Sequence, residues 1–228
     1  MSQTFSLVDS LAVSDLQTYL SRAARVEEGS VRLIGGSGVL AVYSAILYPR
    51  GLLDQTPTVL GLRTFAIQPG ADFDAVVPIR SLLDRLARIG EAVAAGTTPE
   101  GPVEVRMPLE VSTVTWAGIS PPRGGWRPVG QTSFQLLEQT AKTGIAEVAE
   151  AVPTGTGEQL VQRVRAEVWG RPIDDLEYVP AGAAFAAESL GFLAADEPVT
   201  ILETGPWTRL TTRRGHILVR RQAWSLRG

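Results

Sequence analysis

The residue types that most often carry catalysis or bind metals are scarce in this sequence. It contains one histidine, His216, and no cysteine. The lack of cysteine excludes disulfides, thiol nucleophiles, thiolate zinc sites and iron–sulfur clusters. A single imidazole is too few for a zinc or non-haem iron site built on two or three histidines. All-carboxylate magnesium or calcium sites remain open, although the acid pairs Glu27–Glu28 and Asp174–Asp175 lack a metal-loop pattern. We therefore expect no metal and no cofactor.

A glycine-rich run, residues 35–38 (Gly-Gly-Ser-Gly), invites comparison with nucleotide-binding loops and with serine nucleophile elbows. It matches neither Gly-x-Gly-x-x-Gly nor Gly-x-Ser-x-Gly, and β-prone residues rather than a helix follow it. Lys142 has no glycine in the register that a P-loop requires. The run therefore predicts a hairpin turn, with an anion-binding nest and a serine nucleophile as the alternatives.

Arginine with an aromatic neighbour marks the stretch of residues 120–130. Its prolines and glycines break both helix and strand, which predicts a loop, and it contains Arg123, Trp126 and Arg127. Arginine beside an exposed aromatic ring can hold an anion, stack on a ring or anchor a protein partner. These three residues are therefore candidates for binding a ligand or a partner. The alternative is a structured connection whose tryptophan covers the core.

Basic residues also gather near the end of the sequence. Residues 209–228 contain six arginines and no acid, so the remaining residues carry a net charge of −9 within the overall −3. Arg213, Arg214, His216 and Arg220 are further binding candidates. His216 has the chemistry of the base in a Ser–His–Asp/Glu triad. Its place at a predicted hairpin beside arginines, which disfavour the charged imidazole, favours a turn histidine instead.

Nucleic-acid binding through residues 209–221 is a weaker hypothesis. Three helices followed by a basic hairpin is the element order of a winged helix. The helix expected at the recognition position, residues 181–194, has no Arg, Lys, Asn or Gln to read bases. An acidic body also disfavours long-range attraction to nucleic acid or to an anionic membrane. We expect neither to be a partner.

Helix-start signals and apolar periodicity predict the helices around these candidates. Capping boxes begin at Ser14, Thr132 and Thr156, each followed three residues later by glutamine. An apolar stripe predicts a helix over residues 78–95, and small apolar residues predict a buried helix over residues 181–194. Apolar residues at helical spacing predict these core positions: Leu16, Leu20, Leu82, Leu86, Leu137, Ile145, Val164 and Val168.

Runs of β-prone residues between turn residues predict the strands. We expect them at residues 31–34, 39–48, 59–68, 103–107, 109–116, 199–204, 207–213 and 216–221. Successive strands without a long helical crossover favour antiparallel pairing. The sequence therefore predicts an α+β fold, with a largely antiparallel sheet of meanders packed against about five helices. We expect one domain over residues 1–228; two lobes, 1–119 and 131–228, joined by the loop 120–130, are the alternative.

Length and composition are those of a globular protein, with 228 residues of which 44% are apolar and 20% charged. The first ten residues lack the positive charge of a signal peptide. The longest apolar run, residues 39–48, is too short to span a bilayer. Lys142 is the single lysine against 20 arginines, which is typical of a GC-rich genome. We expect a bacterial, cytoplasmic protein that does not enter a membrane.

These features favour a non-catalytic interaction or ligand-binding protein that associates with itself or with another protein. A small anion is a further ligand for its arginines. The alternative is an enzyme that acts on a small anionic substrate through carboxylate and arginine chemistry, which requires an acid of raised pKa beside an arginine in one cleft. The scarcity of the usual nucleophiles and metal ligands argues against an enzyme.

Overall fold

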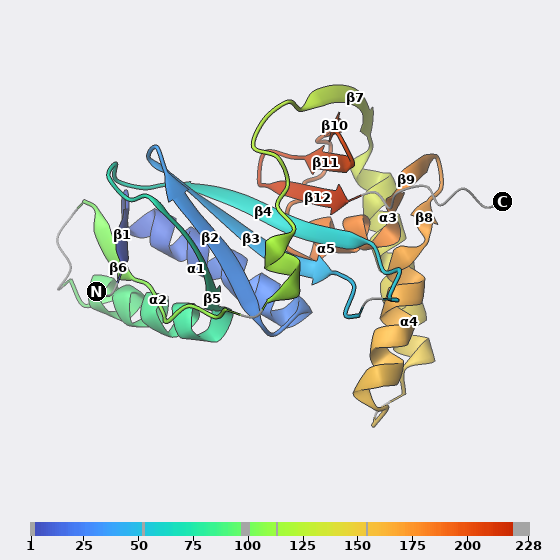
Figure 1. Ribbon diagram of the computed structural model, residues 1–228, viewed down its shortest axis with the longest axis horizontal. Helices are drawn as coiled ribbons and strands as arrows, with labels where there is room; N and C mark the ends of the chain where they lie inside the picture. The colour runs from blue at the N-terminus through green and yellow to red at the C-terminus, as the bar shows by residue number, and fades with distance from the viewer. Residues whose placement is uncertain (1–2, 52, 97–100, 113, 154, 221–228) are drawn as a thin grey trace. The chain divides into compact units, whose positions relative to one another are not determined.

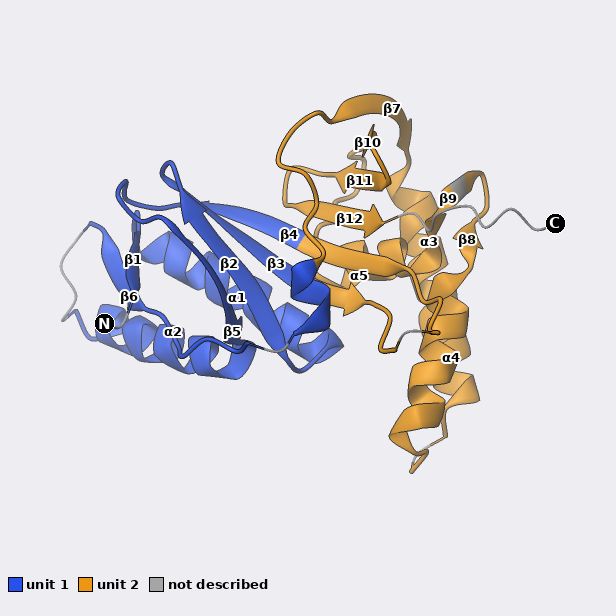
Figure 2. Cartoon of the chain, in the orientation of Figure 1, with its two compact units in different colours: residues 1–44, 62–118 blue, residues 45–61, 119–228 orange. Residues whose placement is uncertain are grey.

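The computed structural model describes residues 3–51, 53–96, 101–112, 114–153 and 155–220 (Figure 1). The chain divides into two compact units (Figure 2). Unit 1 consists of Met1–Ser44 and Leu62–Gly118, and unit 2 of Ala45–Gly61 and Ile119–Gly228. The described residues form five α-helices and one large antiparallel sheet of eight strands. The predicted α+β fold with a largely antiparallel sheet is therefore confirmed.

Unit 1 contains two helices that pack side by side (Figure 1). Its elements are, in chain order, β1 (Thr4–Leu7), α1 (Ser10–Val26), β2 (Ser30–Gly36), β3 (Val39–Leu47), β4 (Thr58–Ala66), β5 (Phe73–Pro78), α2 (Ile79–Ala94), β6 (Val103–Arg106) and the 3₁₀ helix η1 (Thr115–Gly118). The end of β3 and the start of β4 belong to unit 2. The two helices are α1 and α2, and β1 pairs with β6 in a separate antiparallel ribbon.

Unit 2 is built around a short buried helix. Its remaining elements are β7 (Arg127–Thr132), α3 (Phe134–Ala151), α4 (Glu158–Gly170), β8 (Pro172–Ile173), β9 (Leu176–Pro180), α5 (Ala181–Ser189), β10 (Val199–Thr204), β11 (Trp207–Thr211) and β12 (His216–Arg220). The buried helix is α5, which packs against α3 and α4. Ala183 and Ala184 are fully buried, as the small-residue composition predicts, but the helix ends at Ser189 and not at residue 194.

The large sheet has the strand order β5-β2-β3-β4-β12-β11-β10-β7. The pairs β2–β3, β2–β5, β10–β11, β11–β12 and β10–β7 are antiparallel. In the β2–β3 hairpin Gly36 lies opposite Val39, and the two residues between them, Ser37 and Gly38, have φ angles of 51° and 77°. Two left-handed residues match the right-handed twist of the flanking strands. The glycine-rich run is therefore a tight hairpin turn, as predicted.

The helix starts depart from the predicted capping boxes. Helix α1 begins at Ser10, four residues before the predicted start at Ser14, because the Asp9 carboxylate accepts a hydrogen bond of 2.8 Å from the Ala12 N–H. An aspartate at this position satisfies an amide that has no partner within the helix. Ser14 therefore lies inside the helix, and the cap predicted there is wrong.

The caps of α3 and α4 also differ from the prediction. Ser133 rather than Thr132 caps α3, and its hydroxyl accepts from the Leu136 N–H at 3.1 Å. Helix α4 begins after Gly157, without a side-chain cap. The hydroxyl of Thr156 donates instead to the carbonyl of Pro153 at 2.6 Å. A serine or threonine hydroxyl that bonds to the backbone of its own turn is not available to cap the helix. The capping-box pattern alone therefore does not determine which residue caps a helix.

Two loop and strand assignments were wrong. A strand was predicted at residues 109–116, but the described residues there form no regular ladder and end in η1. Pro108 lacks a backbone donor, and Leu109 is 90% exposed. Conversely, the predicted loop 120–130 contains the start of β7, an edge strand that pairs with β10. Pro128 is tolerated there because an edge strand has one side without partners.

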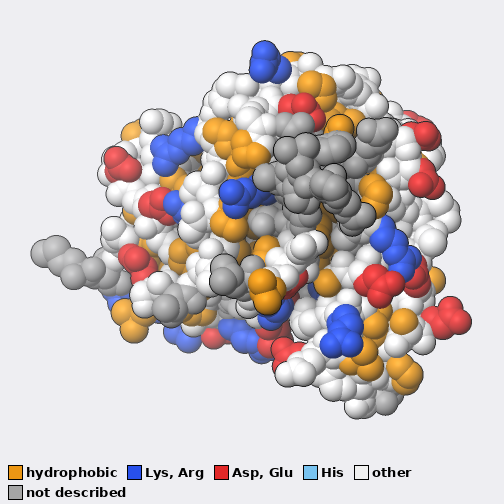
Figure 3. Space-filling model, turned by 45° about the vertical axis from the view of Figure 1, so that its right-hand side comes forward, with side chains coloured by type: hydrophobic (Ala, Val, Ile, Leu, Met, Phe, Trp, Pro, Cys, Tyr) orange, Lys and Arg blue, Asp and Glu red, His pale blue; other side chains and the backbone are white. Residues whose placement is uncertain are grey.

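The predicted core is largely confirmed. Six of the eight positions are buried: Leu16, Leu20, Leu82, Leu86, Leu137 and Val168. Ile145 is wrong, since it is 43% exposed, and Val164 is only half-buried. Helix α3 buries the face of Leu137, Ala141 and Gly144, and Ile145 lies off that face. On the surface seen in Figure 3, hydrophobic side chains lie in small groups between charged ones. Within the described residues, no helix combines the length and hydropathy needed to cross a membrane.

Candidate binding site in unit 2

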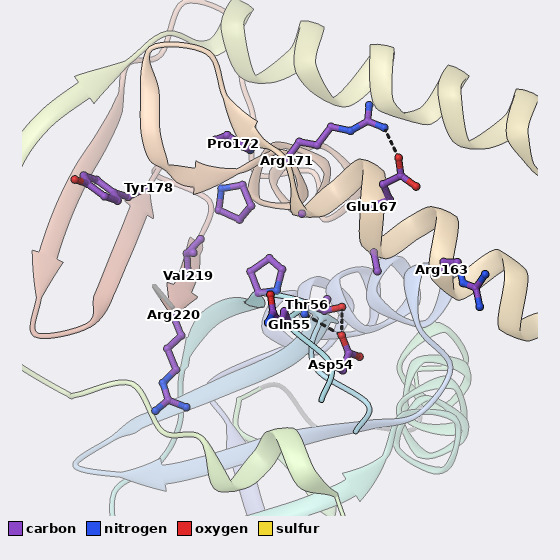
Figure 4. A pocket seen from close by; sticks show the side chains of 14 residues that line it. Asp54, Gln55, Thr56, Arg163, Glu167, Arg171, Pro172, Tyr178, Val219 and Arg220 are labelled. Carbon is purple, nitrogen blue, oxygen red and sulfur yellow. Dashed lines mark hydrogen bonds and ion pairs between the residues drawn. The ribbon is translucent and has the colours of Figure 1, made fainter. Parts of the chain in front are cut away.

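A cavity of about 700 Å³ lies within unit 2 (Figure 4). Three separate stretches of the chain form its walls: the loop of residues 54–57 before β4, the second half of α4 with the β8–β9 hairpin, and the end of β12. These stretches are far apart in the sequence, so only the tertiary fold brings them together. The volume is within the range of pockets that bind small ligands or a few side chains of a partner.

The loop wall is fixed by hydrogen bonds to one carboxylate. One oxygen of Asp54 accepts from the backbone N–H of Thr56 at 2.9 Å and from its hydroxyl at 2.5 Å, and the other accepts from the Arg50 N–H at 2.8 Å. Desolvation acts to raise the pKa of Asp54, but these hydrogen bonds outweigh it, so the pKa lies below its usual value. The Asp54 carboxylate therefore stabilises the conformation of the loop to which it belongs.

The helix wall carries an ion-pair network. Arg171, which follows α4, donates to both oxygens of Glu147 in α3 at 2.7 and 2.9 Å and to Glu167 in α4 at 3.2 Å. Hydrogen bonds to Glu147 and Glu167 raise the pKa of Arg171. The three side chains are substantially exposed, so the network contributes little to stability.

The floor of the cavity is apolar. Val219 in β12 is buried, and Pro57, Pro172 and Pro180 line the cavity around it. Tyr178 in β9 is 47% exposed at the rim. Proline and valine lose little side-chain entropy when a ligand covers them. The cavity thus combines a rigid apolar floor with a polar and aromatic rim.

The Arg–Trp loop predicted from sequence forms a different contact. The indole N–H of Trp126 donates to the carbonyl of Pro122 at 3.1 Å, and the ring lies 4.6 Å from the Arg209 guanidinium of β11. Arg123 and Arg127 are exposed. Desolvation lowers the pKa of Arg209, and its Nε atom is buried without a hydrogen-bond partner among the residues that the structure describes. The structure thus brings Trp126 together with Arg209, which belongs to the basic stretch of residues 209–228 but was not one of the seven candidate binding residues.

The candidate binding residues of the basic C-terminal hairpin do not lie together. Arg213 pairs with Glu197 at 3.4 Å, and Arg214 is exposed. His216 is half-buried, and its Nδ1 lies 3.1 Å from the hydroxyl of Thr211. Burial, with a smaller contribution from the charge of Arg209, lowers the pKa of His216 to about 4. The imidazole is therefore neutral at pH 7, and the hydrogen bond described for it joins it to a hydroxyl.

Of the sequence candidates, Arg220 lines the cavity and the other six do not. Sequence reasoning missed the loop of residues 54–57, Arg163 and Tyr178. The one local signal was the Asp54–x–Thr56 spacing, which is typical of an aspartate-stabilised turn. Among the described residues, no group of three or more His, Asp or Glu side chains is placed to hold a metal ion.

Two family models match the chain, and both describe domains of unknown function. DUF8010 matches residues 1–105, and DUF8185 matches residues 121–224. A search of curated proteins found no match.

Solved structures resemble the chain over nearly its whole length. The DNA polymerase III subunit beta of Borrelia burgdorferi is 8% identical, with a TM-score of 0.53 over 99% of this chain and 66% of its own. The sliding clamp of Bartonella birtlesii is 13% identical, with a TM-score of 0.53 over 98% and 67%. That of Bacillus subtilis is 10% identical, with a TM-score of 0.50 over 100% and 67%. The chain thus has a fold like that of the DNA polymerase sliding clamps and spans about two thirds of their length.

Proposed function

We propose that this chain is a non-catalytic, self-associating protein of the bacterial cytoplasm that holds a segment of a partner protein in the cavity of unit 2. The observation that supports this most is the sliding-clamp-like fold over the whole chain. Two of those proteins are named as subunit beta of DNA polymerase III, and a subunit is in contact with other proteins. Because a shared fold does not by itself assign a function, the further support comes from the chemistry of the cavity.

The chemistry of the cavity supports a protein segment as its ligand. Pockets that bind ligands are mostly apolar with a few placed polar groups. Here the apolar floor around Val219 supplies contact area, and Tyr178 and the arginines at the rim supply orientation. Tyrosine and arginine are among the side chains that are enriched where proteins bind one another.

The charge of the chain does not favour duplex DNA as the ligand. Its net charge is −3, and helices α3 and α5 carry more acids than bases. Binding to duplex DNA relies on several phosphate contacts by lysine or arginine. The proposal therefore concerns protein partners.

Self-association is tested by size-exclusion chromatography with light scattering across a wide range of protein concentration. We expect a mass of at least twice 24.4 kDa at the upper concentrations. A mass of one chain throughout the range refutes self-association.

Partner binding is tested by selecting a random peptide library, displayed on phage, against the full chain. Ala166→Trp fills the cavity from α4, and Ala149→Trp places the same side chain on the exposed surface of α3. We expect selected peptides to bind the original chain and the Ala149→Trp variant but not the Ala166→Trp variant. Peptides that bind both variants equally would place the binding surface elsewhere.

A further inference from the structure

We infer that the segment held by the cavity is an acidic one, with carboxylates on both sides of an apolar side chain, and that Arg163 and Arg220 bind those carboxylates. This inference rests on the proposed function and specifies its ligand. It follows from the charged side chains that line the cavity and from which of them form ion pairs.

The acids of the wall are engaged within the protein. Asp54 accepts three hydrogen bonds from Arg50 and Thr56, which occupy both of its oxygens. Glu167 pairs with Arg171 at 3.2 Å. Glu167 is thus held by a cation, whereas the donors to Asp54 are uncharged backbone and hydroxyl groups that fix its position in the loop.

Two arginines of the wall are in the opposite situation. Arg163 in α4 and Arg220 at the end of β12 are both exposed and both line the cavity. In the part of the chain that the structure describes, neither forms an ion pair with a carboxylate. Arg171, by contrast, is held by Glu147 and Glu167. The cavity lining contains three arginines and two acids, Asp54 and Glu167, so the net charge of the wall is positive.

The positions of the two arginines fit an extended segment. Figure 4 shows Arg163 and Arg220 on opposite sides of the group of labelled side chains, with the loop residues Gln55 and Thr56 between them. The apolar floor of Pro57 and Val219 belongs to the same cavity. Arginine binds carboxylates through two parallel hydrogen bonds. A peptide with an apolar side chain over the floor and an acid toward each arginine satisfies both features.

A peptide fits this arrangement better than a nucleic acid does. A nucleic-acid strand presents a phosphate at every nucleotide, and binding it relies on a continuous positive groove with stacking rings. Here the two arginines share the cavity wall with prolines, a valine and the acids Asp54 and Glu167, and the whole chain has a net charge of −3. The charge pattern therefore selects a ligand with few, spaced negative groups.

The experiment uses the phage library selected on the full chain. We expect the selected peptides to be enriched in Asp and Glu on both sides of a Leu, Ile, Phe or Trp. The best of them, made as a fluorescent synthetic peptide, should bind with an affinity that falls as salt increases. Arg163→Glu and Arg220→Glu should each weaken binding by about tenfold or more. Arg123→Glu reverses an exposed arginine of unit 2 outside the cavity and should leave the affinity unchanged.

Three results would overturn the inference. The first is a set of selected peptides without acids; the second is an acidic peptide that Arg163→Glu and Arg220→Glu bind as well as the original chain does. The third is a single-stranded oligonucleotide that displaces the peptide from the original chain and loses affinity in both variants, which would assign the cavity to nucleic acid. If no peptide is selected at all, the proposed function itself fails. Circular dichroism of each variant checks that it is folded.

Discussion

Replacing Gly144 in α3 by alanine sets two effects of opposite sign against each other. In a helix interior, alanine is favoured over glycine by up to about 1 kcal/mol because it loses less backbone entropy on folding. In this structure a Cβ atom on Gly144 would lie 2.2 Å and 2.5 Å from two ring carbons of Trp169 in α4. Real Cβ atoms do not approach other atoms so closely, so either the ring or the helix must move.

The ring has little room to move. Trp169 is buried, and its ring stacks on Phe185 of α5 with centroids 4.4 Å apart and planes 17° apart. Forcing an extra methyl group into such packing costs about 1–3 kcal/mol. After the gain in helix propensity is subtracted, we expect Gly144→Ala to lower the free energy of unfolding by about 1 kcal/mol. The packing of Gly144 against Trp169 thus reverses the sign that helix propensity alone would give.

Gly90 in α2 provides the matched control. A Cβ atom there would meet its nearest neighbour, the side-chain oxygen of Gln17, at 3.8 Å, which is an ordinary contact. Gly90→Ala should therefore stabilise the protein by about 0.5–1 kcal/mol. Urea denaturation followed by circular dichroism measures both variants. A Gly144→Ala variant as stable as Gly90→Ala would refute the close packing of α3 on Trp169, whereas partial rescue by Trp169→Phe would support it.

Three smaller changes test other contacts. His216 has a pKa of about 4 when folded and 6.5 when unfolded, so between these values the unfolded chain binds a proton that the folded chain does not. The free energy of unfolding should therefore fall by up to about 3 kcal/mol as the pH drops from 6.5 to 4. In a plot of melting temperature against pH, His216→Asn should flatten this part of the curve. Parallel curves for the variant and the original chain would contradict a buried, neutral imidazole. Tyr19→Phe removes the hydroxyl that lies 2.8 Å from the buried Ser44 hydroxyl, and urea denaturation should show that the free energy of unfolding falls by about 1–2 kcal/mol. Unchanged stability would show that this hydrogen bond does not stabilise the fold. Ser133→Ala removes the cap of α3 and should cost about 1 kcal/mol by the same assay; no change would mean that another group caps the Leu136 N–H.

The parts of the fold that could be predicted are those with an unambiguous local signal. Helix α2 was placed within one residue at each end, because Pro78 fixes its start and its apolar stripe is continuous. The strands of the C-terminal meander were also found, since Gly205–Pro206 and Gly215 mark its turns. At the start of α1 the capping-box pattern predicted Ser14, whereas Asp9 caps the helix, so that pattern alone did not locate the helix start.

The parts that could not be predicted depend on contacts distant in the sequence. Strand β7 contains Pro128 and Gly130, which have a low strand propensity, and it forms because β10 offers it a partner. The cavity depends on residues 54–57, α4 and β12 meeting in one unit. Arg220 could be proposed as a binding residue because it lies in the basic C-terminal stretch. No feature of the sequence distinguishes Arg163 from the other arginines of the chain.

The chain enters unit 2 twice, first at Ala45–Gly61 and again at Ile119–Gly228. The two family models follow the sequence in order instead, as residues 1–105 and 121–224. A gene fragment cut between these models would encode a second half without residues 54–57, one wall of the cavity. Recombination at that boundary would thus separate residues 54–57 from the other residues that line the cavity.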